Sequence, residues 1–330
     1  MADKILESLT ARTLFDLRGV VAVVTGGGTG YAKGIGMMIS STLVANGATV
    51  YIIGPEQGDL DKRAASLFHD AASHDVPTWG RMYGLQGDIR LKSEATRLAA
   101  EVGKREQAVT VLFNNAGINP SHYERPPATA PAAAYVAACF DGVSQADFTD
   151  TLNTNAVGPY WLTFAFLPLL ERWKAAAHGT KFAPQVVMTS SMNGWSKDPA
   201  TCGFSFPYLF SKSALGHATA SLAHELLPLG VRVNGIAPGL FPTQLITQSS
   251  DSLGRSTFPP GFNPGCEVPA GAGTPRDMGT LALFLVANWH VNGETVLIDG
   301  GPHILPPPSA PLKDVRLSHA QTLLKHPSSY

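Results

Sequence analysis

The sequence predicts an α/β fold built as a doubly wound parallel sheet with helices on both faces. Short apolar runs rich in β-branched residues alternate with segments of helical length along the chain, which is the pattern of repeated βαβ units. Several of these runs end in Gly, Asn or Ser, as at Thr25 to Gly26 and at Ser190 to Gly194. Open parallel sheets carry their chemistry at the carboxyl ends of the strands, so these endings indicate a site.

The elements follow one another with short connections, and no internal repeat or second core is apparent. We therefore expect one domain at 19–301, preceded by an N-terminal arm at 1–18 and followed by a proline-rich extension at 302–330. Strands are predicted at 20–25, 48–53, 81–86, 109–114, 185–190, 231–236 and 295–298. Helices are predicted at 35–46, 59–73, 91–103, 147–175, 206–228 and 276–287.

Composition excludes several classes of partner. The 24 basic and 25 acidic residues nearly balance, so neither nucleic acid nor an anionic membrane is expected to bind. The N-terminus is too polar for a signal peptide, and no apolar stretch reaches the ~18 residues of a membrane span. Cys139, Cys202 and Cys266 are far apart, which favours free thiols over a disulfide framework and predicts no metal site. A cytoplasmic protein is expected.

Tyr208 and Lys212 form a candidate acid/base pair. They stand four residues apart in a helix-prone segment, and this spacing puts them on one helical face. A fixed positive charge favours the phenolate, so Lys212 is expected to lower the pKa of Tyr208 from its ordinary value near ~10 toward working pH. Taken alone, the pair also fits an ordinary surface helix.

Three strand endings accompany this pair. The apolar run from Gln185 delivers Ser191 at its end, the run from Val111 ends in an Asn-Asn-Ala-Gly turn at Gly117, and the run from Val20 enters a glycine-rich loop. Glycines there allow a backbone to approach a pyrophosphate, while the following helix directs its N-terminal amides at the phosphates.

Over residues 14–301 the chain resembles the short-chain dehydrogenase/reductase family, in its single-domain branch, and fungal NADP-dependent reductases in particular. The fold implied is Rossmann-like. The resemblance rests on motifs that occur in the family's order: Thr25-Gly26 with Gly34-Ile35-Gly36, Gly87-Asp88, Asn114 to Gly117, Asn155, Ser191, Tyr208 with Lys212, Pro238-Gly239 with Thr243, and Asp299 to Gly301.

The resemblance implies a role for each matching residue. Tyr208 would exchange a proton with the substrate oxygen, Ser191 would donate a hydrogen bond to that oxygen, and Asn155 would hold a water of the proton relay. Lys212 would bind the nicotinamide ribose besides acting on Tyr208. The implied cofactor site consists of Gly26, Gly30, Gly34, Ile35, Gly36, Asp88, Asn115, Gly117, Tyr208, Lys212, Phe241 and Thr243.

The phosphate loop is longer than is usual in the family, as though Tyr31 to Gly34 had been inserted. Such a segment either bulges away from the cofactor or rearranges its cradle, and in the second case Lys33 offers a charge to a phosphate. Both interpretations remain open from the sequence.

Two further loops are long. The segment 119–144 is rich in Pro and Ala and is either a mobile solvent loop or a substrate lid that carries His122, Tyr123 and Arg125. The loop between Ser191 and Tyr208 is expected to roof the substrate pocket. Its aromatic residues either favour an apolar or aromatic substrate or pack the loop down: Trp195, Phe204 and Phe206. We expect a small, apolar substrate.

We expect NADP(H) to be preferred over NAD(H). No acid stands at Ile52, Ile53 or Gly54, where NAD-dependent enzymes of this fold carry a carboxylate that repels a 2′-phosphate. The position after the glycine is Pro55, so a positive charge would have to come from Lys33 or Arg63.

The function predicted is transfer of hydride between the cofactor and a carbonyl or secondary alcohol, in secondary metabolism. A non-redox dehydratase, epimerase or cyclase, and a cofactor-sensing protein without chemistry, are the alternatives. By the same resemblance the expected partner is a second copy of the chain, in a dimer or tetramer formed through the two long helices.

Overall fold

The structure is a computed structural model and includes no ligand. It describes residues 2–27, 34–69, 79–172, 182–202, 204–243, 245–247, 249, 256–261 and 271–301. Gly30, Lys33, Cys266, most of the phosphate-loop insertion and the extension at 302–330 lie outside the described residues.

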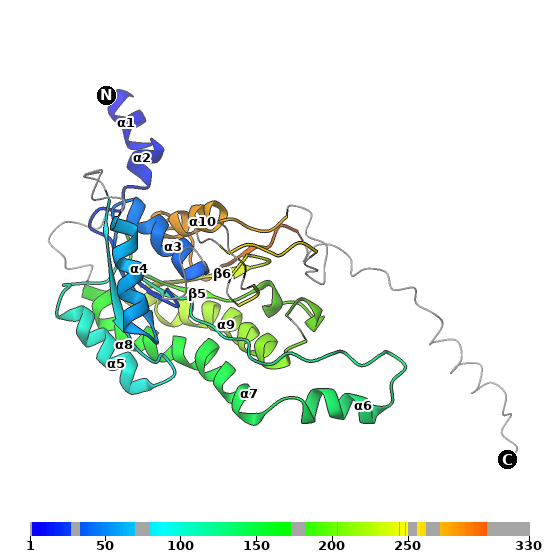
Figure 1. The fold of residues 1–330 in the computed structure, drawn as a ribbon. Helices are drawn as coiled ribbons and strands as arrows, with labels where there is room; N and C mark the ends of the chain where they lie inside the picture. Colours follow the sequence, from blue (N-terminus) through cyan, green and yellow to red (C-terminus); the bar gives the residue numbers. More distant parts are fainter. Residues whose placement is uncertain are drawn as a thin grey trace, which may run out of the picture.

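Seven parallel strands form one sheet in the order β3-β2-β1-β4-β5-β6-β7 (Figure 1). The chain starts at the centre of the sheet, moves to the β3 edge and then returns to the other side of β1 with β4. This reversal opens a crevice at the carboxyl ends of β1 and β4, and it confirms the doubly wound fold. The strands are β1 (Val21–Thr25), β2 (Thr49–Gly54), β3 (Arg81–Gln86), β4 (Val111–Asn114), β5 (Gln185–Thr189), β6 (Arg232–Pro238) and β7 (Thr295–Ile298).

The central strands are buried on both faces because helices cover each side. Every residue of β4, β5 and β6 is buried, which explains their continuous apolar sequences. Two core clusters lie on opposite faces, and Val24 and Val187 belong to one while Val23 and Val186 belong to the other. This division follows the alternation of side chains along a strand.

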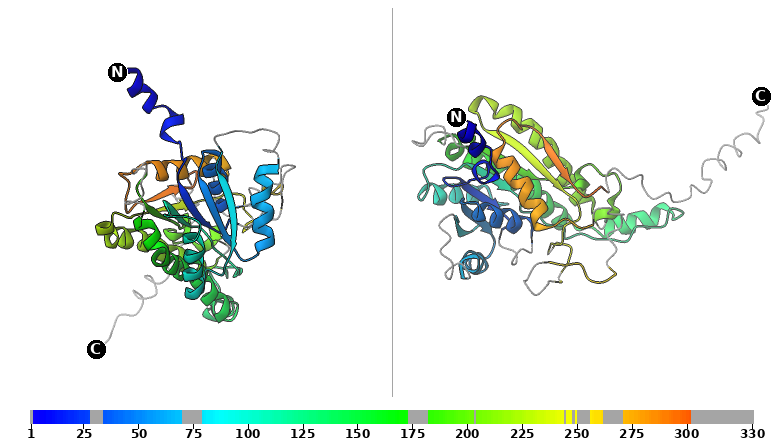
Figure 2. Two further views of the ribbon diagram at one scale, coloured as in Figure 1. Left: turned by 90° about the vertical axis from the view of Figure 1, so that its left-hand side faces the viewer. Right: turned by 90° about the horizontal axis from the view of Figure 1, so that it is seen from above.

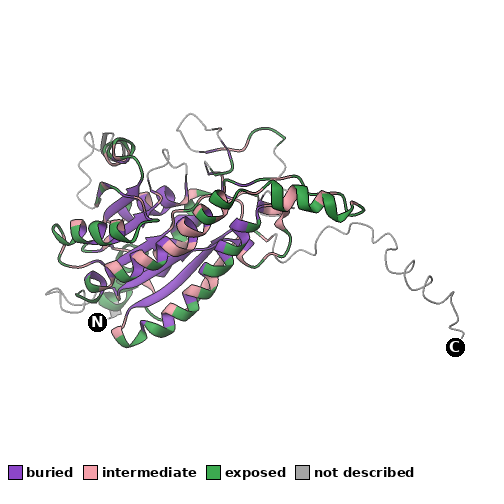
Figure 3. Cartoon of the chain, turned by 90° about the horizontal axis from the view of Figure 1, so that it is seen from below, coloured by how far each residue is buried: buried purple, intermediate pink, exposed green. Residues whose placement is uncertain are grey.

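Two layers of helices enclose the sheet (Figures 2 and 3). Helices α3 and α10 contribute to the first cluster, and α5, α8 and α9 to the second. Their buried faces pack on the sheet while their outer faces are exposed. The bounds are α3 (Ile35–Ala45), α4 (Gln57–His69), α5 (Lys92–Gly103), α8 (Gly158–Arg172), α9 (Phe206–Glu225) and α10 (Pro275–Ala287).

The prediction of a single continuous helix at 147–175 is wrong in one respect. Helix α7 (Gln145–Leu152) passes into a π-helical turn, η3 (Asn153–Val157), before α8 begins at Gly158. Hydrophobic periodicity does not distinguish a π turn from regular helix. Such turns are frequent at functional sites, and this one contains Asn155.

Short helices occupy two segments for which no element was predicted. The arm contains α1 (Ala2–Ser8) and α2 (Ala11–Leu14), and the long segment after β4 contains α6 (Ala132–Val136) with a π-helical turn, η2 (Ala137–Asp141). Figure 1 shows both pieces projecting from the body of the domain. Among the helices that the structure describes, none is both long and apolar enough to cross a bilayer.

Candidate active site

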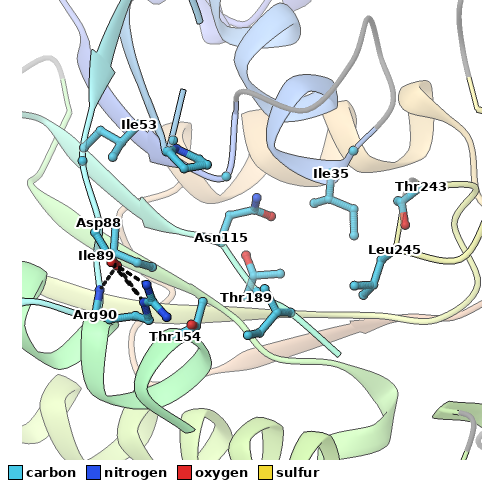
Figure 4. A pocket seen from close by; sticks show the side chains of 18 of the residues that line it. Ile35, Ile53, Asp88, Ile89, Arg90, Asn115, Thr154, Thr189, Thr243 and Leu245 are labelled. Atoms are coloured by element: carbon cyan, nitrogen blue, oxygen red, sulfur yellow. Dashed lines mark hydrogen bonds and ion pairs between the residues drawn. The ribbon is translucent and has the colours of Figure 1, made fainter. Parts of the chain in front are cut away.

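A cavity of about 1210 Å³ lies at the carboxyl ends of the strands (Figure 4). Its lining brings together most of the predicted site residues, from β1 at one end to the loop after β6 at the other. Asn155 and Gly36 do not line it, and Gly30 lies outside the described residues. The predicted residues in the lining are Gly26, Gly34, Ile35, Asp88, Asn115, Gly117, Ser191, Tyr208, Lys212, Phe241 and Thr243.

Glycines bring the phosphate loop against the end of β4. Gly26 has φ 73°, and a Cβ atom there would lie 2.8 Å from the Cα of Ala116. A Cβ on Gly36 would lie 2.7 Å from Nδ2 of Asn115, so neither position accepts a side chain. Gly34 is the N-cap of α3 and leaves the first amides of that helix without a side-chain cap. This arrangement fits a pyrophosphate.

Asn115 joins β4 to β1 across the crevice. Its Nδ2 donates to the carbonyl of Thr25 over 3.0 Å, and its backbone N–H donates to Oγ1 of Thr25 over 3.0 Å. Its Oδ1 is buried and has no hydrogen-bond partner among the described residues. Because Asn115 lines the cavity, the free oxygen is available to a ligand such as a ribose hydroxyl.

Asp88 holds an arginine at the opposite end of the cavity from Tyr208. The Arg90 guanidinium donates to both carboxylate oxygens, with Nη2 to Oδ2 at 2.7 Å (Figure 4), and it also pairs with Asp150 of α7 at 3.3 Å. These hydrogen bonds lower the pKa of Asp88. An adenine bound at this end would therefore contact the ion pair of Asp88 and Arg90. The sequence had predicted a contact with the Asp88 carboxylate alone.

Tyr208 lies in the first turn of α9, which Ser205 caps by accepting from the Tyr208 N–H. Burial raises the pKa of Tyr208 to about 12, and a hydrogen bond with Ser191 lowers it by less. The predicted lowering of this pKa by Lys212 is thus not what the structure shows. Removal of the phenol from water disfavours the phenolate more than the neighbouring groups favour it.

Lys212 is buried beside Tyr208 and directed at β5. Its Nζ donates to the carbonyl of Thr189 over 2.7 Å and lies 5.7 Å from the centroid of the Tyr208 ring. Burial lowers the pKa of Lys212 to about 8. The ammonium is therefore the form present at neutral pH, and it loses its proton in the mildly alkaline range.

Asn155 clamps the chain that leaves β4. Its Oδ1 accepts from the N–H of Ile118 over 2.8 Å, and its Nδ2 donates to the carbonyl of Ile118 over 2.9 Å and to Oγ of Ser211 over 3.0 Å. The side chain is fully buried. These contacts tie the segment after β4 to α9, and the role of Asn155 in holding a water of the proton relay stays a prediction.

Sequence reasoning missed the hydroxyls that hold Ser191 against α9. Oγ of Ser190 donates to the carbonyl of Lys212 over 2.7 Å, and Oγ of Ser213 donates to the carbonyl of Gly194 over 2.8 Å. The backbone N–H of Asn193 donates to Oγ of Ser191 over 3.2 Å. The same oxygen donates to the carbonyl of Pro238 over 3.5 Å, a long hydrogen bond that a closer acceptor can replace. The doubled serine was the only signal of this network in the sequence.

The two long loops pack on each other. Tyr123 lies 6.2 Å from Phe204 and 6.2 Å from Phe206 between ring centroids, and Nδ2 of Asn119 donates to the carbonyl of Cys202 over 3.1 Å. Arg125 and Asp198 add an exposed ion pair at 3.7 Å. The beginning of the 119–144 segment therefore packs on the loop between Ser191 and Tyr208. No described residue of 119–144 or 192–207 lines the cavity, so the roof and the lid both stay predictions.

The site as a whole is suited to acid/base chemistry beside a bound dinucleotide. It has a glycine cradle and helix N-terminus at one point, an amide oxygen without a partner at another, and a phenol, a hydroxyl and an ammonium at the far end. No group of His, Cys, Asp and Glu residues in the described part of the chain is arranged to hold a metal ion.

Comparison with known proteins agrees with this geometry. Residues 20–253 match the family model of short chain dehydrogenases. The chain is 32% identical to short-chain dehydrogenase/reductase PhomF of Diaporthe leptostromiformis, over 91% of this chain and 97% of that protein. It is 31% identical to short-chain dehydrogenase/reductase VdtF of Byssochlamys spectabilis, over 89% and 96%.

A bacterial relative and a solved structure extend the comparison. The rhamnolipids biosynthesis 3-oxoacyl-[acyl-carrier-protein] reductase of Pseudomonas aeruginosa is 28% identical over 88% of this chain and 98% of that protein. The solved NADP active-site complex of Pseudomonas aeruginosa RhlG superposes with a TM-score of 0.64 at 26% identity, covering 88% of this chain and 98% of that one. The protein belongs to the short-chain dehydrogenase/reductase family and is an oxidoreductase of that family, whose members bind a nicotinamide cofactor.

Proposed function

We propose that the protein is a ketoreductase that transfers hydride between NADP(H) and a carbonyl or secondary alcohol of a small, apolar substrate. The bound nicotinamide supplies the hydride. The observation that carries the proposal is the convergence of Tyr208, Ser191 and Lys212 at one end of a cavity whose other parts suit a dinucleotide.

Tyr208 and Ser191 handle the substrate oxygen in this proposal. The raised pKa of Tyr208 keeps the phenol protonated at neutral pH, so it is ready to donate its proton when a carbonyl becomes an alkoxide. Ser191 donates a hydrogen bond to the same oxygen, in the orientation favoured by the Asn193 N–H. Both contacts strengthen as negative charge develops, which is the condition for catalysis.

An apolar substrate fits one part of the cavity wall. Leu245 and Ile246 line the cavity and are exposed there, and Figure 4 shows the Leu245 side chain directed inward. The named relatives are fungal reductases and a reductase of rhamnolipid biosynthesis, which supports a role in the biosynthesis of a secondary metabolite.

NADPH is expected to be the preferred cofactor. Strand β2 carries no acid, and Gly54, Pro55 and Gln57 line the cavity at its end, so no carboxylate of this strand repels a 2′-phosphate. The test is a panel of apolar ketones assayed with NADPH and with NADH at fixed ionic strength. We expect oxidation of NADPH with at least one ketone, and a lower Kd for NADPH than for NADH. Tighter binding of NADH contradicts the cofactor assignment, whereas turnover without oxidation of either cofactor contradicts the function.

We also propose that two copies associate through α8 and α9. The α8 residues 158–170 include no Asp, Glu, Lys or Arg. The α9 residues 206–224 include one of these charged types, Lys212, and it is buried. Tyr160, Phe164 and Phe210 are nevertheless 48%, 37% and 54% exposed on these helices. Light scattering is expected to give the mass of a dimer or tetramer, and Phe164→Asp is expected to lower it. A wild-type monomer contradicts this proposal.

A further inference from the structure

Thr189, the last residue of β5, has a buried hydroxyl without a partner. The residue is 4% exposed, and no described residue offers its Oγ1 a hydrogen bond. Buried hydroxyls are seldom left unpaired, because they lose their water without compensation. The group is therefore either a structural weakness or half of a contact with a ligand.

The hydroxyl faces the cavity. Thr189 is among the residues that line it, and Figure 4 shows its side chain in the same space as that of Asn115. Asn114 is in register with Met188, so the residues that follow them, Asn115 and Thr189, lie side by side on adjacent strands. Each has one buried oxygen without a partner among the described residues.

The position of Thr189 identifies the half of the ligand that it meets. Its own carbonyl accepts the hydrogen bond from Lys212, and Ser191 follows two residues later. The Asp88 and Arg90 pair marks the other end of the cavity. A group that hydrogen-bonds Thr189 must therefore belong to the reacting end of a dinucleotide.

We propose that the Thr189 hydroxyl hydrogen-bonds the nicotinamide half of the cofactor, so that the last residue of β5 contributes its side chain to cofactor binding, while Ser191 serves the substrate oxygen. The inference rests on the proposed function, which takes the ligand of this cavity to be a nicotinamide dinucleotide. Binding then supplies the partner that the hydroxyl lacks.

Thr189→Val tests this proposal because valine keeps the shape and removes the hydroxyl. We expect its Kd for NADPH to rise about tenfold in a fluorescence titration. In protein without added cofactor, we expect the Tm to stay at or above that of the wild type, since an unpaired buried group has been removed. Affinity and stability thus change in opposite directions, which a merely structural role does not produce.

Three controls accompany this variant. Thr189→Ser keeps the hydroxyl and should bind NADPH within about twofold of the wild type. Thr219→Val removes a buried hydroxyl that already donates to the carbonyl of Leu215 over 2.9 Å, and it should leave the Kd unchanged. Adenosine 2′,5′-bisphosphate lacks the nicotinamide half and should bind the wild type and Thr189→Val equally.

The outcomes separate this inference from the proposed function. An NADPH Kd that is equal in the wild type and Thr189→Val overturns the inference alone, as does a matching loss of affinity for adenosine 2′,5′-bisphosphate. A lowered Tm of Thr189→Val without cofactor also overturns it, because the hydroxyl was then already paired. A wild type that binds neither NADPH nor NADH overturns the proposed function and this inference with it.

Discussion

Tyr208→Phe is expected to lower kcat for ketone reduction by about a hundredfold or more, the contribution of a positioned general acid. The substitution removes the proton donor and keeps the ring that packs in the first turn of α9. Burial raises the pKa of the phenol to about 12, so it holds its proton at neutral pH until the substrate oxygen gains negative charge. Steady-state kinetics with a ketone from the panel provides the measurement.

Cofactor binding separates a chemical defect from a folding defect in this variant. We expect the Kd of Tyr208→Phe for NADPH to stay within about threefold of the wild type, since the ammonium and the glycine cradle are intact. Tyr51→Phe is a matched control, because it removes a phenol hydroxyl that donates to Glu106 over 2.7 Å on a buried residue that does not line the cavity. Activity of Tyr208→Phe within a few-fold of the wild type contradicts the mechanism.

Lys212→Ala is expected to damage binding and turnover together. The ammonium is the only described cation in the lining at the Tyr208 end of the cavity, and losing a charged hydrogen-bond donor there should raise the Kd for NADPH by about tenfold to a hundredfold. Deletion of the side chain also leaves the Thr189 carbonyl without its donor. An unchanged Kd contradicts the assignment of Lys212 to the cofactor.

The pH dependence of binding gives a second measurement on Lys212. In the protein without cofactor, burial lowers the pKa of Lys212 to about 8. A bound cofactor is expected to favour the charged form of Lys212. Affinity should therefore be constant below pH 8 and fall as the pH rises through this value, by up to about tenfold for each further unit. Lys212→Ala should lack the inflection. A wild-type profile that is flat across this range contradicts a role for the charge.

Much of the fold was predictable because its signals are local. The continuous apolar sequences of β4, β5 and β6 reflect burial on both faces, and the structure has these strands within two residues of the predicted limits. The π turn at Asn153–Val157 was not predictable, since a change in hydrogen-bond pattern leaves the hydrophobic spacing intact. Helices α1 and α6 were missed because their exposed sequences lack an apolar face that packs on a core.

The sequence predicted that Ser191, Tyr208 and Lys212 share one site, and all three line one cavity. Their roles stay predictions, and the electrostatics of the site could not be predicted. The pKa of Tyr208 depends on burial, which sequence spacing does not give, and the expected sign was therefore wrong. The hydroxyl of Ser190 donates to the carbonyl of Lys212 on α9, whereas that of Thr189 is buried without a partner among the described residues. Only the folded chain defines these two environments.

Transfer of deuterium from C4-deuterated NADPH to a ketone is the most direct test of hydride transfer by this site. Mass spectrometry of the alcohol formed from a ketone of the panel gives the result, with Tyr208→Phe run in parallel. The proposal predicts one deuterium on the former carbonyl carbon with the correctly labelled face of the cofactor, and about a hundredfold less alcohol from the variant. A product without deuterium from either labelled face, formed while the cofactor stays reduced, would contradict it and indicate non-redox chemistry.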